Sequence, residues 1–191
     1  NFWLPAELVR EKIGSVGIPI FHIDMKTVRD DGSSCDDGEE GELLIRGPHV
    51  FAGYWQNPEA TAETIVDGWL HTGDIAMRDA DGCYSILGRS KEMFISGGEN
   101  VYPAEIESVL LAHPQVLEAA VVSISHDTWG EVGRAFLVVE DGFDEAELRD
   151  FVGERLARYK QPRSIVVIDK LPLTAIGKID KKVLEAWEQT S

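Results

Sequence analysis

Cysteine and basic residues are both scarce in this 191-residue sequence. The two cysteines, Cys35 and Cys83, are too few for the disulfide framework of a small secreted domain. The 18 Lys and Arg side chains are outnumbered by 34 Asp and Glu side chains, which gives a formal net charge of -16. Because this charge repels nucleic-acid phosphates and anionic membrane surfaces, we expect neither as a partner.

Long apolar runs and the spacings typical of metal ligands are also missing. No run is long enough for a signal peptide or a membrane span, so we expect a cytoplasmic location. The five histidines lack the short spacing of a metal-binding motif, and we expect no structural metal. The 43% hydrophobic content can nevertheless fill the core of one large domain or two small domains.

The sequence pattern of the first half of the chain is typical of antiparallel β structure. Short β-prone runs such as FHIDMKTV, GELLIRG and YSILG are divided by Asp-Gly turns at 31–32, 37–38, 67–68 and 81–82. One helix is predicted at residues 57–65, where Asn57 is suited to cap and Pro58 to the first helical position. The acidic stretch DDGSSCDDGEEGE is interpreted as a solvated loop.

After Gly88 strands and helices alternate, which predicts an α+β unit. Helices are expected from Pro103 to about Ala112 and from about Asp144 to Tyr159, between strands in LEAAVVSI, RAFLVVE and SIVVID. In the second of these helices, one apolar face predicted to be part of the core consists of Leu148, Phe151, Val152, Leu156 and Tyr159.

Four motifs follow one another between residues 41 and 178. They are GELLIRGPHVFAGYWQNPEAT at 41–61, GWLHTGD at 68–74, GRSKEMFISGGENVYPAEIE at 88–107 and LPLTAIGK at 171–178. In order and spacing the sequence resembles the C-terminal part of the adenylate-forming enzymes, which include acyl-coenzyme A synthetases, peptide-synthetase adenylation domains and beetle luciferases. The resemblance implies that residues 1–88 are the last segment of a β-barrel subdomain and residues 89–191 a small mobile C-terminal domain.

The resemblance implies roles for two residues at the nucleotide. Asp74 matches the aspartate that accepts hydrogen bonds from both ribose hydroxyls, a task that suits a carboxylate because it has acceptor sites only. Arg89 matches an arginine that also contacts the ribose, for which its forked donors are suited. In an isolated Thr-Gly-Asp, Asp74 is better interpreted as a turn aspartate, and a surface ion-pair partner is the alternative for Arg89.

The resemblance also implies a hinge and a tunnel. Lys91 falls at the position of the family's hinge, where backbone dihedral angles change between two states. Gly97 and Gly98 match the loop that lines the tunnel for the pantetheine arm of coenzyme A, since glycines let a thin ligand approach the backbone. A β-turn is the alternative interpretation of this glycine pair, and a charged loop residue is the alternative for Lys91.

Lys178 follows a glycine near the end of the sequence, in LTAIGKIDK. The second glycine and the Ser or Thr of a nucleotide-binding P-loop are missing around it, so it is no P-loop. The resemblance implies that Lys178 is the catalytic lysine, whose ammonium stabilises charge that develops on the α-phosphate during adenylation. A solvated surface lysine is the alternative for an isolated Gly-Lys pair.

The resemblance implies ATP, Mg²⁺ and coenzyme A as cofactors and a small carboxylic acid as the substrate. The phosphate loop, the magnesium-binding glutamate and the acyl pocket belong to a region that this sequence lacks, so we expect an inactive fragment that self-associates through uncovered apolar surface. A fatty-acid coenzyme A ligase is expected ahead of an aryl-acid ligase or a peptide-synthetase adenylation domain. A non-catalytic binding or regulatory module is the alternative from another class.

Overall fold

The computed structural model describes residues 1–187 and divides the chain into two compact units, Asn1–Lys91 and Glu92–Ser191. Both units combine strands and helices, which confirms the predicted α+β class. The interpretation of residues 1–88 as a barrel segment and of 89–191 as a mobile domain stays a prediction. No helix of the described residues is long and apolar enough to cross a membrane.

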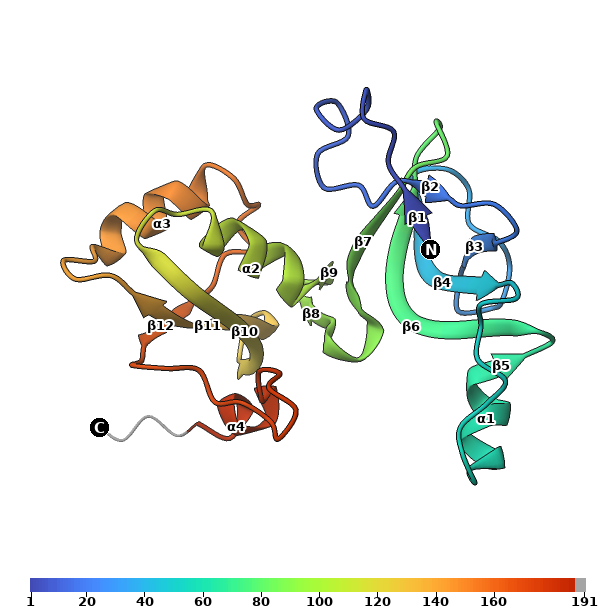
Figure 1. The fold of residues 1–191 in the computed structure, drawn as a ribbon. Helices are drawn as coiled ribbons and strands as arrows, with labels where there is room; N and C mark the ends of the chain where they lie inside the picture. The colour runs from blue at the N-terminus through green and yellow to red at the C-terminus, as the bar shows by residue number, and fades with distance from the viewer. Residues whose placement is uncertain (188–191) are drawn as a thin grey trace. The chain divides into compact units, whose positions relative to one another are not determined.

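The first unit is mainly antiparallel β, as its alternating runs and Asp-Gly turns predict (Figure 1). Its elements are β1 (Phe2–Trp3), β2 (Ile18–Pro19), β3 (Asp24–Val28), β4 (Glu40–Arg46), α1 (Pro58–Thr64), β5 (Ile65–Val66), β6 (Trp69–Arg78) and β7 (Tyr84–Arg89). The main sheet has the order β3-β4-β6-β5, and β7 pairs with β6. The long strand β6 bends, so that the sheet curls like part of a barrel (Figure 1).

A small core fills the curled sheet of the first unit. Its buried side chains are Leu43, Ile45, Ala76 and Tyr84, against which Phe2, Val16, Ile23, Met25 and Val50 pack. The Tyr84 hydroxyl donates to the backbone oxygen of Met25 at 3.1 Å, so the polar end of this buried ring is satisfied. The core therefore joins β3, β4, β6 and β7 to the N-terminal residues.

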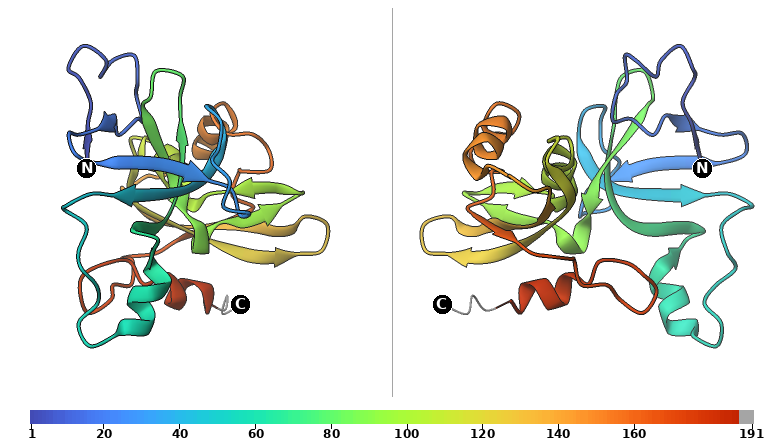
Figure 2. Two further views of the ribbon diagram at one scale, coloured as in Figure 1. Left: turned by 90° about the vertical axis from the view of Figure 1, so that its right-hand side faces the viewer. Right: turned by 60° about the vertical axis from the view of Figure 1, so that its left-hand side comes forward.

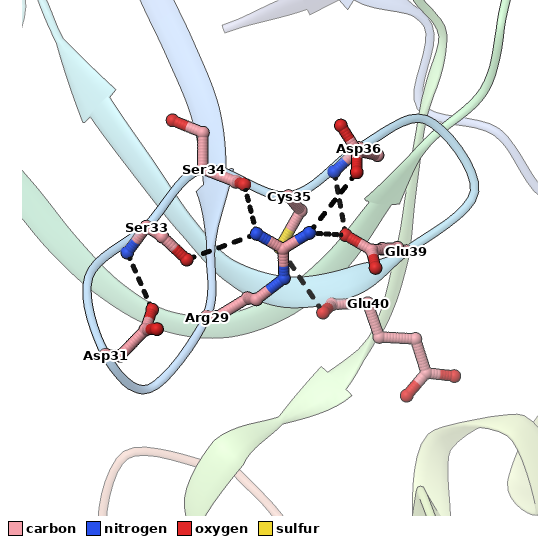
Figure 3. Close-up of polar contacts among 8 residues, drawn as sticks. All are labelled: Arg29, Asp31, Ser33, Ser34, Cys35, Asp36, Glu39 and Glu40. Atoms are coloured by element: carbon pink, nitrogen blue, oxygen red, sulfur yellow. Dashed lines mark hydrogen bonds and ion pairs between the residues drawn. The ribbon is translucent and has the colours of Figure 1, made fainter.

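The loop between β3 and β4 is the acidic stretch of the sequence, and Arg29 organises it (Figure 3). The Arg29 guanidinium donates to the backbone oxygen of Ser34 at 2.6 Å and contacts the carboxylates of Asp36 and Glu39. The backbone N–H of Asp36 and the Arg29 charge hold the pKa of Glu39 below its usual value. The loop is exposed to solvent, as predicted, and the Arg29 guanidinium joins its polar groups.

The second unit is a sheet covered on both faces (Figures 1 and 2). Its elements are β8 (Phe94–Ser96), β9 (Glu99–Val101), α2 (Pro103–Leu111), β10 (Val116–His126), β11 (Gly130–Val139), α3 (Glu145–Gly153), β12 (Ser164–Val167) and α4 (Lys181–Glu185), and the one-turn 3-10 helix η1 (Ser90–Glu92) precedes them. The strand order is β10-β11-β8-β9, with β12 parallel to β11. The hairpin of β10 and β11, yellow in Figure 2, is the longest pairing in this sheet.

Successive residues of this hairpin belong to two cores. On one face Val121 and Leu137 pack against side chains of α2 and α3, including Ile106 and Leu148. On the opposite face lies a smaller cluster of Ala120, Val122, Phe136, Leu171 and Leu184, the last of which belongs to α4. Because successive side chains of a strand point to opposite faces, one continuous apolar run contributes to both cores.

Helix predictions are confirmed at α1 and α2, whereas the prediction for α3 is wrong in length. The expected helix of residues 144–159 ends at Gly153, because glycine is a poor helix former and the next backbone bonds are short-range turns. Leu156 is still buried with Leu148 and Val152 as predicted. The short elements α4 and β9 were not predicted from the sequence.

Candidate functional site

Asp74 and Arg89 lie opposite one another in the antiparallel pair of β6 and β7. Arg89 Nε is 2.9 Å from Asp74 Oδ1, and the side chains are 51% and 29% exposed. The hairpin therefore brings two of the residues predicted at the nucleotide into direct contact. Both ends of the pair are accessible to a ligand.

Strand β6 is irregular just before Asp74. Its pairing with β4 shifts register, since Glu42 pairs with Ile75 whereas Leu44 pairs with His71. Residues 72–74 therefore bulge opposite a single residue of β4, and Gly73 takes a positive φ of 69°. Bulges of this kind bend a strand and redirect side chains, which explains both the bend of β6 and the direction of Asp74.

Glu42 holds the first part of the bulge from the neighbouring strand. Its Oε1 accepts from the backbone N–H of Gly73 at 3.1 Å, and its Oε2 lies 2.8 Å from Nδ1 of His71. The side chains of Glu42 and His71 are 29% and 34% exposed. One carboxylate therefore replaces the ladder hydrogen bonds that the bulge interrupts.

Thr72 and Arg89 complete the support. The Thr72 hydroxyl donates to the backbone oxygen of Leu43 at 2.7 Å and accepts from the N–H of Asp74 at 3.1 Å. Arg89 Nη1 donates to the backbone oxygen of Thr72 at 2.9 Å. The backbone of Asp74 is therefore fixed, while its second carboxylate oxygen can accept hydrogen bonds from a ligand's hydroxyl groups.

Lys91 is exposed in η1 and is the last residue of the first unit. The division between the two units therefore falls directly after the residue predicted as the hinge. This location agrees with the requirement that a hinge lie between rigid parts. Movement at Lys91 itself stays a prediction.

Gly97 and Gly98 form the two-residue turn between β8 and β9. Their φ angles are +62° and +93°, as hairpin turns of this length require. Gly97 also lies against the ring of Trp129, since an added Cβ would come 2.7 Å from Trp129 Cε3. The turn is thus explained by local structure, and its predicted role at a coenzyme A tunnel stays a prediction.

Lys178 lies on an exposed loop of the second unit. Leu173 and Ile179 form a β-bridge at its base, and the N–H of Thr174 donates to the Lys178 oxygen at 2.7 Å. Gly177 takes a positive φ of 78°, which tightens the turn before the lysine. Within residues 1–187 no ion pair to the Lys178 ammonium is found, so this charge is presented to solvent.

Glu42, Thr72 and Trp129 contact the predicted residues or their neighbours but were not themselves predicted from the sequence. Glu42 and Thr72 belong to the quoted motifs, so their place in the motifs was an available signal. Trp129 belongs to none of them and joins the Gly97 turn only through pairing of the strands. Among the described residues, no group of three or more His, Cys, Asp or Glu side chains could hold a metal ion.

Two family models match parts of the chain. Residues 2–55 match the family described as AMP-binding enzyme, and residues 105–178 match the family described as AMP-binding enzyme C-terminal domain. The chain belongs to the AMP-binding enzymes. The chain has the fold of the C-terminal part of the adenylate-forming enzymes, as the four motifs predict.

Curated relatives are much longer than this chain. It is 47% identical over 175 residues to a feruloyl-CoA synthase of an Amycolatopsis species, covering 91% of this chain and 36% of the relative. It is 46% identical over 184 residues to a 2-succinylbenzoate--CoA ligase of Geobacillus kaustophilus, covering 95% and 37%. The chain thus spans little more than a third of the length of these relatives.

A solved structure supports the same assignment. The o-succinylbenzoate CoA synthetase of Bacillus subtilis, in complex with its acyl-adenylate intermediate, superimposes with a TM-score of 0.90 at 42% identity. The match covers 95% of this chain and 37% of that one. Another structure of that synthetase contains ATP and magnesium. The expected preference for fatty acids gains no support here, because the named relatives are ligases of aromatic acids.

Proposed function

We propose that this chain is part of a longer, AMP-forming ligase that joins a carboxylic acid to coenzyme A. The observation that carries the proposal is the Asp74–Arg89 pair, held by the β6 bulge in a chain of the AMP-binding family. ATP, Mg²⁺ and coenzyme A are the proposed cofactors. The nucleotide complexes of the Bacillus subtilis synthetase support the first two.

The proposed reaction has two steps. A substrate carboxylate oxygen attacks the α-phosphorus of ATP, the bond to pyrophosphate breaks and an acyl adenylate forms. The thiol of coenzyme A then attacks the acyl carbon, and AMP leaves. Asp74 and Arg89 hold the ribose, and Lys178 stabilises charge on the α-phosphate oxygens in the first step.

The two steps are proposed to need two positions of the second unit, with Lys91 as the hinge and the Gly97–Gly98 turn at the tunnel for the thiol arm. Lys178 then acts in the first position only. Its ammonium, presented on an exposed loop, is suited to enter and leave a site.

An aryl acid is the proposed substrate class, in place of the fatty acid expected from the motifs. The names of the feruloyl-CoA synthase and the 2-succinylbenzoate--CoA ligase support this choice. Measurement of pyrophosphate release with ferulate, 2-succinylbenzoate and a long-chain fatty acid tests it on the longer protein. Turnover with the fatty acid alone would reject the aryl assignment and keep the ligase.

Lys178→Ala in the longer protein tests the mechanism. Adenylation should slow by about 10²-fold to 10³-fold, because one electrostatic contact to the transition state is lost. Transfer from pre-formed acyl adenylate to coenzyme A should be unchanged in single-turnover assays. Lys182→Ala, which removes a neighbouring exposed lysine, is the matched control and should alter neither step.

Equal losses in both steps for Lys178→Ala would contradict this role and assign the lysine to folding or general nucleotide binding. A longer protein that binds ATP but forms no adenylate with any acid would instead favour the alternative of a non-catalytic module.

A further inference from the structure

Lys181 lies three residues after Lys178, at the start of α4, and two carboxylates hold its ammonium. Nζ is 2.6 Å from Glu92 Oε2 and 2.9 Å from Glu107 Oε1. The side chains of Lys181, Glu92 and Glu107 are 21%, 33% and 19% exposed. The three side chains of this cluster are therefore partly buried.

The cluster joins separate elements of the second unit. Glu92 belongs to η1 and Glu107 to α2, and Glu107 Oε1 also accepts from the N–H of Val121 in β10 at 2.8 Å. Burial alone lowers the pKa of Lys181, but the hydrogen bond that its ammonium donates to Glu92 and the charge of Glu107 outweigh it, so the pKa is raised. Lys181 consequently stays charged at neutral pH.

The loop that carries Lys178 is joined directly to this cluster. Its base is the Leu173–Ile179 bridge and a bond from the N–H of Asp180 to the Pro172 oxygen at 2.8 Å. Asp180 is next to Lys181, so a shift of Lys181 moves the base of the loop. Beyond its base the loop is exposed and adds little packing of its own, as shown by Ile176, which is 79% exposed.

We infer that Lys181 is a positioning residue that sets the place of Lys178 by fixing the base of its loop against Glu92 and Glu107. The inference rests on the proposed function, because Lys178 must act on a phosphate for its place to matter. Catalytic groups need placement within a fraction of an ångström, and a 1 Å displacement can cost about 10²-fold in rate.

A purely stabilising ion pair is the competing explanation. Partly exposed ion pairs are weak sources of stability, since solvent weakens their attraction and holding the long side chains in one geometry costs entropy. Apolar contacts already fix the chain on either side, because Leu171 and Leu184 are buried in one cluster. Fold stability therefore gives little reason for this cluster of three charges, whereas placement of the loop gives one.

A double-mutant cycle in the longer ligase tests the inference. We expect Lys181→Met to slow adenylation by about 10-fold to 100-fold and to leave transfer from pre-formed acyl adenylate unchanged. In the Lys178→Ala background the same change should have no further effect, because it acts through Lys178. Lys181→Arg keeps the charge and should restore most of the rate, and Lys182→Met should behave like the unaltered protein.

The outcomes separate this inference from the function on which it rests. Unchanged adenylation in Lys181→Met, or an equal loss in the Lys178→Ala background, overturns the positioning role alone. A normal rate for Lys178→Ala rejects the proposed role of Lys178 itself. If Lys181→Met does not fold, Glu92→Gln, which removes one of the two carboxylate charges, carries the same cycle, and additive losses with Lys178→Ala overturn the inference.

Discussion

Asp79, in the turn between β6 and β7, shows how a single side chain joins distant parts of the first unit. Lys12, in the loop after β1, approaches Asp79 Oδ2 to 2.7 Å. Asp79 Oδ1 accepts from the N–H groups of Asp81 and Cys83 at 3.0 and 2.9 Å. The bond from Lys12, followed by these two amides, lowers the pKa of Asp79 from its ordinary 3.8.

This lowered pKa predicts an acid-dependent loss of stability. The contribution of Asp79 is complete above pH 3.8, the unfolded-state value, and is lost as the pH falls through the lower folded-state pKa. At pH 7, Asp79→Asn should destabilise the first unit by about 0.2 to 1 kcal/mol, since the pair with Lys12 is partly exposed. The difference from the unaltered chain should shrink at pH 3.

Urea denaturation followed by the NMR signals of β6 and β7 measures this difference. Asp67→Asn is the control, because Asp67 is an exposed residue of another Asp-Gly turn. A destabilisation by Asp79→Asn that is the same at pH 7 and pH 3 would contradict the assignment.

At the residue scale the sequence singled out candidate residues but did not predict the contacts between them. The motifs marked Asp74 and Arg89 separately, and their direct pairing required the register of β6 and β7. Glu42 could not be assigned, because its role depends on a bulge in β6 that no local pattern announces. Such a bulge depends on the register between two paired strands, and the sequence of one strand alone does not determine it.

Among the elements, α1 depends most on its own sequence. It buries none of its residues, and the Asn57 side chain accepts from the N–H of Ala60 at 3.1 Å. Pro58 and Glu59 follow in the first turn, where fixed φ and negative charge favour a helix. Local signals therefore sufficed to predict α1, because tertiary packing contributes little there.

Loss of the cap should consequently have a local effect. We expect Asn57→Ala to destabilise α1 by about 1 kcal/mol and to speed amide exchange of residues 60–64 about 5-fold. Asn57→Asp keeps the acceptor and should leave the exchange rate nearly unchanged. A fall in the stability of β4 and β6, or equal effects of Ala and Asp, would show that Asn57 does more than cap.

The C-terminal end of α3 and the existence of α4 were harder to predict, because tertiary contacts decide both. The helical spacing of Leu148, Val152 and Leu156 continues past Gly153, although the helix ends there. Leu156 lies in the turn that follows and is buried all the same, so periodicity alone predicted a helix that is too long. The short α4 is held by the buried Leu184, and its first residue, Lys181, pairs with Glu92 and Glu107. Both features are decided by contacts with residues far away in the sequence.

At the scale of the whole molecule, each unit has a core of its own. Leu43 belongs to the core of the first unit and Leu148 to that of the second, and both side chains are almost fully buried. The cores share no residue. Stability should therefore be lost separately in the two units.

Two matched core substitutions test this separation. Leu43→Ala and Leu148→Ala should each destabilise their own unit by about 2 to 5 kcal/mol, from lost burial and the cavity left behind. Residue-resolved hydrogen exchange should show lower protection in residues 1–91 for the first variant and in 92–187 for the second. Loss of protection in both units from either variant would mean that the chain unfolds as one cooperative body.

The two-sided cover of β10 and β11 has a consequence for the unfolded chain. Residues 119–125 and 135–139 contain no charge, proline or glycine, because both faces of these strands are apolar in the folded unit. When the second unit opens, such segments pair readily with those of other chains. Aggregation then removes unfolded molecules before they can refold, so the lifetime of this protein in warm solution is set by how fast the hairpin is uncovered.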